Sequence, residues 1–333
     1  MKVRMKNDIL LWLAKGDNKT LSVEKAHKAF VKDTKIACEL RLFKTYHGKY
    51  NAGEVEPKVV ASTVITQADI DSIELTTFRA GERKLPTGVF IPYKTGHGID
   101  RLFSQTRTGG GPMKGTVTVA SGGPGVGKST LVYHMQAMLQ GNYPKDEITC
   151  LQSEMRDLDL EWELSEENEG RKPWMAVPNF VLLSEAIRPK GVYRPELTKA
   201  VITKVFQHGY DVLFIDSFED IVQKLKAFGN MSESMAESFL LNLIEATCSG
   251  KNDRGVLTAV IAIQQETKGG LFKGSNKLKH AITGMLHMRK DKKGDRYVMF
   301  SKNRRGGGNV DKAMFFGLDK KGDLVYDVAA FEA

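Results

Sequence analysis

The fold is decided by the stretch Ser121-Gly122-Gly123-Pro124-Gly125-Val126-Gly127-Lys128-Ser129-Thr130. Residues 122–129 match the pattern G-x-x-x-x-G-K-[ST] in full, and its glycines let consecutive backbone N–H groups turn inward around phosphate oxygens. The flanking residues are predicted to form a strand at 116–120 and a helix at 129–140, whose N-terminal dipole also favours phosphate. This context predicts a P-loop, and a glycine-rich turn that only resembles one is the alternative. The residues predicted to bind the nucleotide are Gly122, Gly123, Pro124, Gly125, Val126, Gly127, Lys128, Ser129 and Thr130.

A magnesium ion is expected beside the phosphates. Lys128 is predicted to bridge the β- and γ-phosphates, and the Ser129 hydroxyl to ligate Mg²⁺. Asp216 ends the apolar run 211–216, which is predicted to be a buried strand. Because ligands of an open α/β sheet bind outside the carboxyl ends of its strands, Asp216 is predicted to hold the same ion through water. A carboxylate that only caps the following turn is the alternative.

Two further polar residues end predicted strands at the same edge. Glu154 follows the strand 148–152, where a carboxylate can polarise the water that attacks the γ-phosphate. An exposed glutamate without a catalytic role fits the sequence equally well. Gln265 follows the strand 256–264, and its amide is predicted to sense the γ-phosphate and to pass that state to the following segment.

Basic residues are concentrated in two later segments. Residues 268–280 are glycine-rich and contain four lysines, which suits a loop that tracks a phosphate backbone, although an ordinary basic surface loop is the alternative. Lys302 and Arg304 follow a strand predicted at 297–301. They are predicted to contact nucleic acid or to reach the nucleotide of a neighbouring subunit, and a solvated turn is the remaining alternative. The residues predicted to bind DNA are Lys268, Lys273, Lys277, Lys279 and Arg305.

The composition is that of a globular protein with a basic surplus. The chain has 333 residues, of which 41% are hydrophobic, and a net charge of +9. Residues 268–333 carry 15 Lys and Arg against 7 Asp and Glu, which favours a nucleic-acid surface, although lysines that serve solubility explain the charge as well. No apolar run approaches the ~18 residues of a membrane span, and no signal peptide is recognisable. Cys38, Cys150 and Cys248 lie too far apart for a zinc site or a disulfide framework, so a reducing cytoplasm is expected.

Two domains are predicted. Residues 1–90 are expected to form a basic, partly helical N-terminal domain, in which residues 22–47 have apolar side chains at helical spacing. Residues 91–333 are expected to form an α/β domain, because strands alternate with helices in the βαβ succession of a parallel sheet. The strands are expected at 116–120, 148–152, 180–183, 211–216 and 256–264, with later, antiparallel additions at 297–301 and 313–318.

These motifs, in this order, resemble those of the RecA superfamily, and most closely the ATPase domain of bacterial RadA. The resemblance spans residues 95–333. Its motifs are Thr95-Gly96-His97-Gly98-Ile99-Asp100-Arg101-Leu102, the P-loop, Ser153-Glu154, Ile215-Asp216-Ser217, Gln265-Glu266-Thr267-Lys268-Gly269-Gly270 and Lys302-Asn303-Arg304-Arg305-Gly306. The last two are similar to the family's H-V-T-K-E-G and K-N-R-F-G. Gln265 replaces the histidine, as in RecA and DnaB relatives, and Arg305 replaces the aromatic residue. The sequence matches neither the family's four-cysteine zinc module nor its Lon-protease-like domain.

The resemblance implies a RecA-like core, a mostly parallel sheet flanked by helices, that assembles head to tail into a hexameric ring with ATP between subunits. It implies DNA-stimulated ATP hydrolysis that drives movement on single-stranded DNA in recombination or replication, with recombination or replication proteins as further partners. In that scheme Glu154 is the general base, and Lys302 and Arg304 complete the neighbouring subunit's site. A RecA-type strand-exchange filament, a DnaB-like helicase and a KaiC-like regulatory ATPase acting on protein partners remain alternatives.

Overall fold

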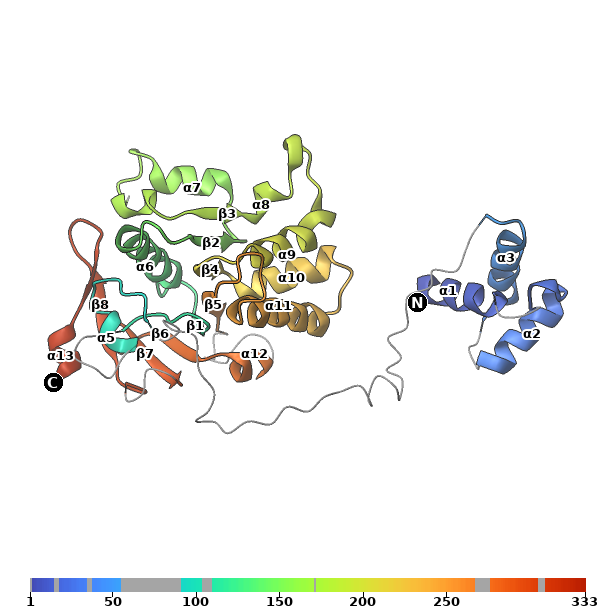
Figure 1. Cartoon of the computed structure of the whole chain (residues 1–333). Coiled ribbons are helices and arrows are strands. Elements are labelled where there is room, and N and C mark those ends of the chain that lie inside the picture. The colour runs from blue at the N-terminus through green and yellow to red at the C-terminus, as the bar shows by residue number, and fades with distance from the viewer. Residues whose placement is uncertain are drawn as a thin grey trace. The chain divides into compact units, whose positions relative to one another are not determined.

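A computed structural model of the protein divides into two compact units, Met1–Arg83 and Lys84–Ala333 (Figure 1). The chain divides between them after Arg83, whereas the sequence predicts the boundary after residue 90. The structure describes residues 2–14, 18–34, 38–54, 91–103, 110–170, 172–266, 276–304 and 309–333.

In its described residues the N-terminal unit is mainly helical, as predicted. Its elements are α1 (Lys2–Leu13), η1 (Asn18–Thr20), α2 (Val23–Thr34) and α3 (Leu40–Asn51). Phe30 of α2 and Phe43 of α3 pack edge to face against Trp12 of α1, with ring centroids 5.8 Å and 6.2 Å from that of Trp12. This aromatic cluster is the core of the unit, because all three side chains are buried.

The larger unit is built on one sheet, which has nine strands in the described residues, in the order β3-β2-β4-β5-β1-β6-β7-β8-β9. The strands are β1 (Val117–Gly122), β2 (Ile148–Gln152), β3 (Phe180–Leu182), β4 (Val212–Asp216), β5 (Ala259–Gln265), β6 (Gly284–Lys290), β7 (Arg296–Asn303), β8 (Met314–Leu318) and β9 (Leu324–Tyr326). Pairs among β1 to β6 are parallel, and β7, β8 and β9 are added antiparallel. The sequence did not predict β6, in which His287 interrupts the apolar run, or the three-residue β9.

Helices cover both faces of this sheet (Figure 1). They are α5 (Asp100–Phe103), α6 (Lys128–Asn142), α7 (Asp157–Leu164), α8 (Leu183–Ala186), α9 (Thr198–His208), α10 (Phe218–Phe228), α11 (Glu233–Cys248), α12 (Asn276–Ala281) and α13 (Val328–Glu332), with short turns η3 (Pro173–Ala176), η4 (Pro189–Gly191) and η5 (Pro195–Leu197). Phe214 of β4 packs in one core with Leu131 of α6, whereas its neighbours Leu213 and Ile215 pack in a second core with Leu240 of α11. Alternate residues of a strand face opposite sides, so a strand covered on both faces is apolar throughout. None of the helices in the described ranges is long and apolar enough to cross a bilayer.

The predicted architecture, an α/β core with a mostly parallel sheet flanked by helices, is confirmed. Strand β5 lies between β1 and β4, so the P-loop strand and the strand of Asp216 are not direct neighbours. The register nevertheless aligns their carboxyl ends, because Ile215 of β4 pairs with Ala262 of β5, and Gln265, three residues further along β5, pairs with Gly122 of β1. One edge of the sheet therefore collects the polar ends of β1, β2, β4 and β5.

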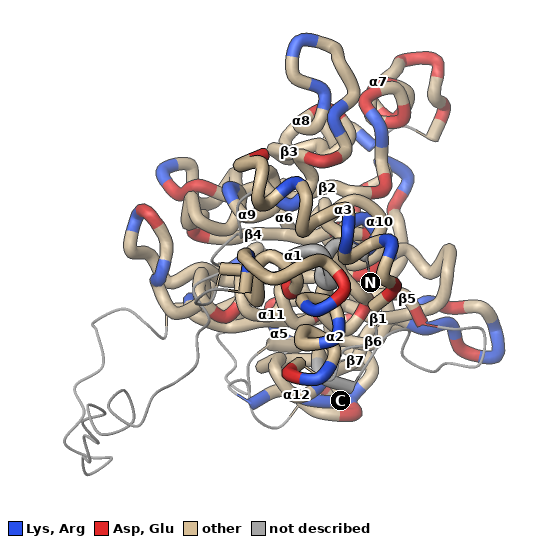
Figure 2. The backbone as a smooth tube through the Cα atoms, turned by 90° about the vertical axis from the view of Figure 1, so that its right-hand side faces the viewer, with Lys and Arg blue, Asp and Glu red and all other residues tan. Residues whose placement is uncertain are grey.

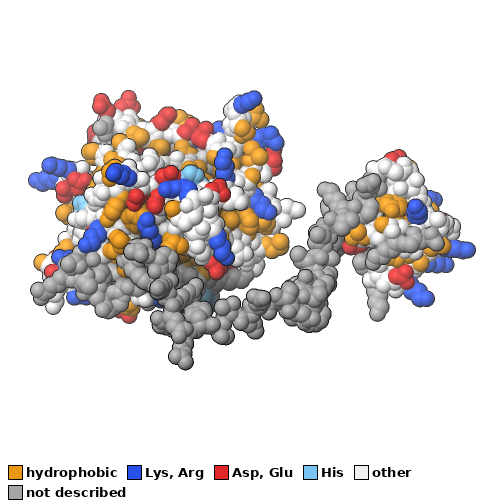
Figure 3. Space-filling view, viewed as in Figure 1, with side chains coloured by type: hydrophobic (Ala, Val, Ile, Leu, Met, Phe, Trp, Pro, Cys, Tyr) orange, Lys and Arg blue, Asp and Glu red, His pale blue; other side chains and the backbone are white. Residues whose placement is uncertain are grey.

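Acidic residues are concentrated on α7, which follows β2. Figure 2 shows several of them along this helix and the loop after it, and Figure 3 shows acidic side chains along the upper border of the larger unit. The acidic residues of α7 itself are Asp157, Asp159, Glu161 and Glu163. A polyanion is repelled by such a surface, so nucleic acid is not expected to bind there.

Candidate nucleotide site

Glycines shape the loop between β1 and α6. Gly125 and Gly127 have φ angles of 70° and 98°, in the left-handed region that residues with a side chain rarely adopt. Gly122 meets a different constraint, since a Cβ there would lie 2.5 Å from the carbonyl oxygen of Met288 on β6. The pattern therefore has glycine where the backbone needs it, and Gly127 caps a helix that begins at Lys128.

Lys128 is held over this loop by backbone oxygens. Its Nζ donates hydrogen bonds to the carbonyls of Gly122 at 3.0 Å and Gly123 at 2.9 Å. Burial lowers the pKa of Lys128, and the carboxylates of Asp216, Glu154 and Glu266 partly oppose that shift. A buried ammonium whose hydrogen-bond partners are neutral carbonyls fits an anionic ligand, and the phosphates of ATP would replace those two carbonyls.

Asp216 lies at the end of β4 and is 3% exposed. Burial raises the pKa of its carboxyl, while hydrogen bonds from the Tyr133 and Ser129 hydroxyls act in the opposite direction. Gln152 also donates to this carboxylate, with 3.4 Å between Nε2 and Oδ2. The structure thus brings together Ser129 and Asp216, the two residues predicted to hold Mg²⁺.

The sequence did not predict that Tyr133 and Gln152 belong to this site. Tyr133 lies four residues after Ser129 on α6, so both side chains project from the same face of the helix, and this spacing was the signal available. Gln152 also donates to the Tyr133 hydroxyl. Among the described residues no group of three or more His, Cys, Asp or Glu side chains has the arrangement of a metal site. A magnesium ion would therefore take its remaining ligands from phosphate and water, which that ion favours.

Glu154 lies just beyond β2, and its side chain is exposed at the sheet edge. Its Oε1 accepts a hydrogen bond from the hydroxyl of Ser217, the N-cap of α10, and a longer one from Nε2 of Gln265 at 3.4 Å. The structure therefore brings Glu154 and Gln265 together, although they are 111 residues apart in the sequence. The sequence analysis names Ser217 only as the last residue of the motif Ile215-Asp216-Ser217 and gives it no role.

Lys302 and Arg304 lie away from the P-loop of their own chain. Asn303, between them, pairs with Gly284 of β6, which pairs with Thr118 at the start of β1. The P-loop follows Gly122, four residues further along β1, and four strand residues span about 13 Å. The two basic side chains are therefore at the opposite end of the strands from the phosphates that the same chain would bind.

Lys302 instead binds the backbone of its own chain. Its Nζ donates to the carbonyl oxygen of Lys279 on α12 at 2.6 Å. Partial burial and the nearby Arg304 lower the pKa of Lys302. Of the residues predicted to bind DNA, Lys279 is thus described, whereas Lys268, Lys273 and Arg305 and the side chain of Lys277 lie outside the described residues.

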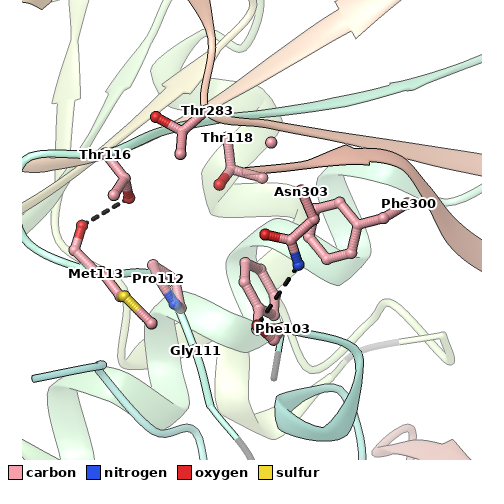
Figure 4. Close-up of a pocket in the computed structure, with 10 residues that line it drawn as sticks. Phe103, Gly111, Pro112, Met113, Thr116, Thr118, Thr283, Phe300 and Asn303 are labelled. Carbon is pink, nitrogen blue, oxygen red and sulfur yellow. Dashed lines mark hydrogen bonds between the residues drawn. The ribbon is translucent and has the colours of Figure 1, made fainter. Parts of the chain in front are cut away.

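A small pocket lies at the amino end of β1 (Figure 4). Its volume is about 20 Å³, which holds about one water molecule and no nucleotide. Asn303 lines it and donates to the carbonyl oxygen of Phe103 at 3.5 Å. The other lining residues include Thr116, Thr118 and Phe300. This pocket is separate from the nucleotide site, which is at the carboxyl end of the same strand.

Solved structures are similar to this chain, whereas family models and curated proteins are not. No protein-family model and no curated protein matches the chain. Among solved structures, a KaiC-like protein from the hyperthermophilic archaeon Pyrococcus horikoshii is similar, with 21% identity, a TM-score of 0.45, and coverage of 73% of this chain and 98% of that one. The flagellar accessory protein FlaH from Methanocaldococcus jannaschii is similar with 14% identity, a TM-score of 0.45, and coverage of 66% and 93%. At these values neither structure carries an argument about the family or the activity of this chain.

Proposed function

We propose that this protein is a RecA-like, DNA-stimulated ATPase that uses hydrolysis to move on or remodel single-stranded DNA in recombination or replication. The observation that supports the ATPase activity is the convergence of five side chains at one sheet edge. Lys128 and Ser129 come from the P-loop, and Asp216 comes from the end of β4. Glu154 and Gln265 come from the ends of β2 and β5.

The chemistry follows from these positions. With ATP bound, Lys128 would exchange its two carbonyl partners for phosphate oxygens, and Ser129 and Asp216 would hold Mg²⁺, which would neutralise phosphate charge. Glu154 is exposed and oriented by Ser217 and Gln265, so it can hold the attacking water and accept its proton. In-line hydrolysis of this kind depends on positioning and charge more than on covalent chemistry.

The assembly and the DNA-binding surface belong to the same proposal. Because Lys302 and Arg304 are remote from the P-loop of their own chain, a head-to-tail ring would let them reach the nucleotide of the next subunit. Residues 268–333 have a surplus of positive charge, whereas α7 is acidic. This distribution favours binding of a polyanion such as DNA to residues 268–333 and away from α7.

The steady-state ATPase rate with and without single-stranded DNA, over a series of salt concentrations, tests this function. Stimulation by DNA that weakens as salt rises is the expected result, because phosphate contacts release counterions. Nucleotide turnover that is indifferent to DNA would contradict the motor and favour the KaiC-like regulatory alternative. Electron microscopy with ATP and DNA then separates a ring from a RecA-type filament, and strand displacement separates a helicase from a recombinase.

A further inference from the structure

Four polar side chains form a continuous hydrogen-bonded chain across the sheet, beginning directly beside the P-loop. The Ser121 hydroxyl donates to Oε1 of Glu266 at 2.8 Å, and Nδ1 of His287 lies 2.9 Å from the same oxygen and 2.8 Å from the Ser121 hydroxyl oxygen. On the other side of the ring, Nε2 of His287 lies 2.7 Å from the hydroxyl of Ser301. The four residues come from β1, the position after β5, β6 and β7, so the chain of bonds crosses three adjacent strand pairs.

The contacts indicate which nitrogen of the imidazole carries the proton. Ser121 directs its proton to Glu266, and a carboxylate is an acceptor only, so both oxygens beside Nδ1 of His287 are acceptors. Nδ1 therefore carries a proton, which lies between Glu266 and the Ser121 oxygen. In the neutral ring Nε2 then accepts from the Ser301 hydroxyl. Ser121 is fully buried, so no substrate can reach its hydroxyl for nucleophilic attack, and the Ser–His–Glu set is not a hydrolase triad.

At its outer end the chain of bonds joins a β-bulge. Met285 of β6 pairs with Lys302, but the next residue, Leu286, pairs with Phe300, so Ser301 is the extra residue of β7. A bulge bends its strand and re-aims the side chains around it. Here it turns Ser301 towards His287 and directly precedes Lys302, whose Nζ is bound to α12 through the Lys279 carbonyl.

At its inner end the chain of bonds joins the nucleotide site at two points of the backbone. Ser121 precedes Gly122, and Glu266 follows Gln265 and donates its backbone N–H to the Gly122 carbonyl at 3.1 Å. The Glu266 carboxylate also acts electrostatically on Lys128. Phosphates placed beside Lys128 would repel this carboxylate, and Glu266 is bonded to His287, so a displacement of one moves the other.

We propose that His287 is a positioning residue, which passes the nucleotide state from Gln265 and Glu266 to the bulge at Ser301 and so sets the direction of Lys302 and Arg304. The inference rests on the proposed function, in which those two side chains act on the next subunit's nucleotide. It assigns to β6 and β7 a mechanical link between one nucleotide site and the next.

The test is backbone hydrogen exchange of the full-length protein, with and without Mg·ADP or a non-hydrolysable ATP analogue, read at residues 299–304. In the wild type, nucleotide should change the exchange of these amides. His287→Asn keeps an N–H near the position of Nδ1 but has no atom at Nε2, so the change should be lost while nucleotide affinity stays the same. Ser301→Ala should give the same loss, and it decides the question if His287→Asn fails to fold.

The matched control is His208→Asn. His208 is paired with Glu147, which precedes β2 at the opposite end of the strands, so this variant removes a histidine–glutamate pair far from the P-loop. It should keep the response at residues 299–304. Loss of the response in this variant as well would attribute the effect to general loosening and overturn the assignment of His287.

A second measurement separates this positioning role from a structural one. If His287 acts through Lys302, the kcat of the double variant His287→Asn/Lys302→Ala should equal that of Lys302→Ala alone, with KM unchanged. Independent losses that multiply would overturn the link. Nucleotide binding without any change at residues 299–304 in the wild type also overturns the link but leaves the ATPase proposal intact, whereas absence of nucleotide binding overturns both.

Discussion

At the scale of single residues, the candidate site depends on how neighbouring groups orient a few carboxylates and one ammonium. Glu154 is exposed but held by Ser217 and Gln265, whereas Asp216 is buried and held by Tyr133, Ser129 and Gln152. The two carboxylates therefore suit different tasks, a base open to water and a charge fixed beside a metal ion.

Replacing the proposed base should separate binding from chemistry. Glu154→Gln removes the proton acceptor but keeps an oxygen for Ser217, so kcat should fall by about 10²–10⁴-fold while the affinity for nucleotide stays near that of the wild type. Single-turnover hydrolysis and nucleotide titration measure the two quantities. Glu161→Gln on α7 is the matched control and should hydrolyse ATP normally. Full activity of Glu154→Gln would show that another group activates the water.

The buried carboxylate of Asp216 should make the stability of the protein depend on pH. Because burial raises the pKa of Asp216, the stability linked to this group is present below its unfolded pKa and is lost as pH rises through its higher folded pKa. Without nucleotide or Mg²⁺, Asp216→Asn should therefore have a higher urea midpoint than the wild type at pH 7, and this advantage should vanish below pH ~4. Equal midpoints at both pH values would contradict a destabilising charge at this position.

At the scale of elements, the P-loop depends on the close approach of β1 to β6. Leu286 and Met288 of β6 pack into the core on the α6 side, whereas Met285 packs on the other side, so this strand is held from both faces. The carbonyl of Met288 consequently lies against Gly122, where the loop begins.

A methyl group at this contact should disturb the sheet. Gly122→Ala places Cβ 2.5 Å from the Met288 oxygen, and because backbone cannot yield easily, the variant should lose about 1–3 kcal/mol of stability. Gly123→Ala is the matched control, since nothing lies within 4 Å of its Cβ, and its stability should change by no more than about 0.5 kcal/mol. Thermal unfolding of both variants measures the difference. Equal melting temperatures would mean that β6 shifts at little cost.

At the scale of the whole molecule, the nucleotide site of one chain is incomplete under the proposed function. The register places Lys302 and Arg304 at the far end of the strands from the P-loop, and Lys302 is bound to α12 of its own chain. Under that proposal, completion of the site would require a second subunit.

Mixing two inactive variants tests this requirement. Lys302→Ala should bind ATP but hydrolyse it about 10³-fold more slowly, and Lys128→Ala should fail to bind it. A mixture of the two should regain activity, because the intact P-loop of a Lys302→Ala subunit can form a site with the intact Lys302 of a neighbouring Lys128→Ala subunit. Lys320→Ala, in the exposed turn after β8, is the control and should behave as the wild type. If Lys302→Ala hydrolyses ATP at the full rate, the trans-acting role is wrong.

The sequence alone determined the P-loop, the α/β class and most of the strands. A P-loop grips phosphate with the backbone of contiguous residues, so its pattern is readable without the fold. The apolar runs at β2 and β4 are equally local, because a strand buried on both faces needs apolar side chains throughout. The strand-end position of Asp216 and Glu154 could be predicted for the same reason.

Only the tertiary structure decided which of these ends lie together. Strand order placed β5 between β1 and β4, and register then brought Gln265 to Glu154 and Glu266 to Ser121. Such pairs are more than a hundred residues apart in sequence, and the periodicity of a strand carries no information on its neighbour or its register. For that reason His287 and the bulge at Ser301 could not be predicted from the sequence.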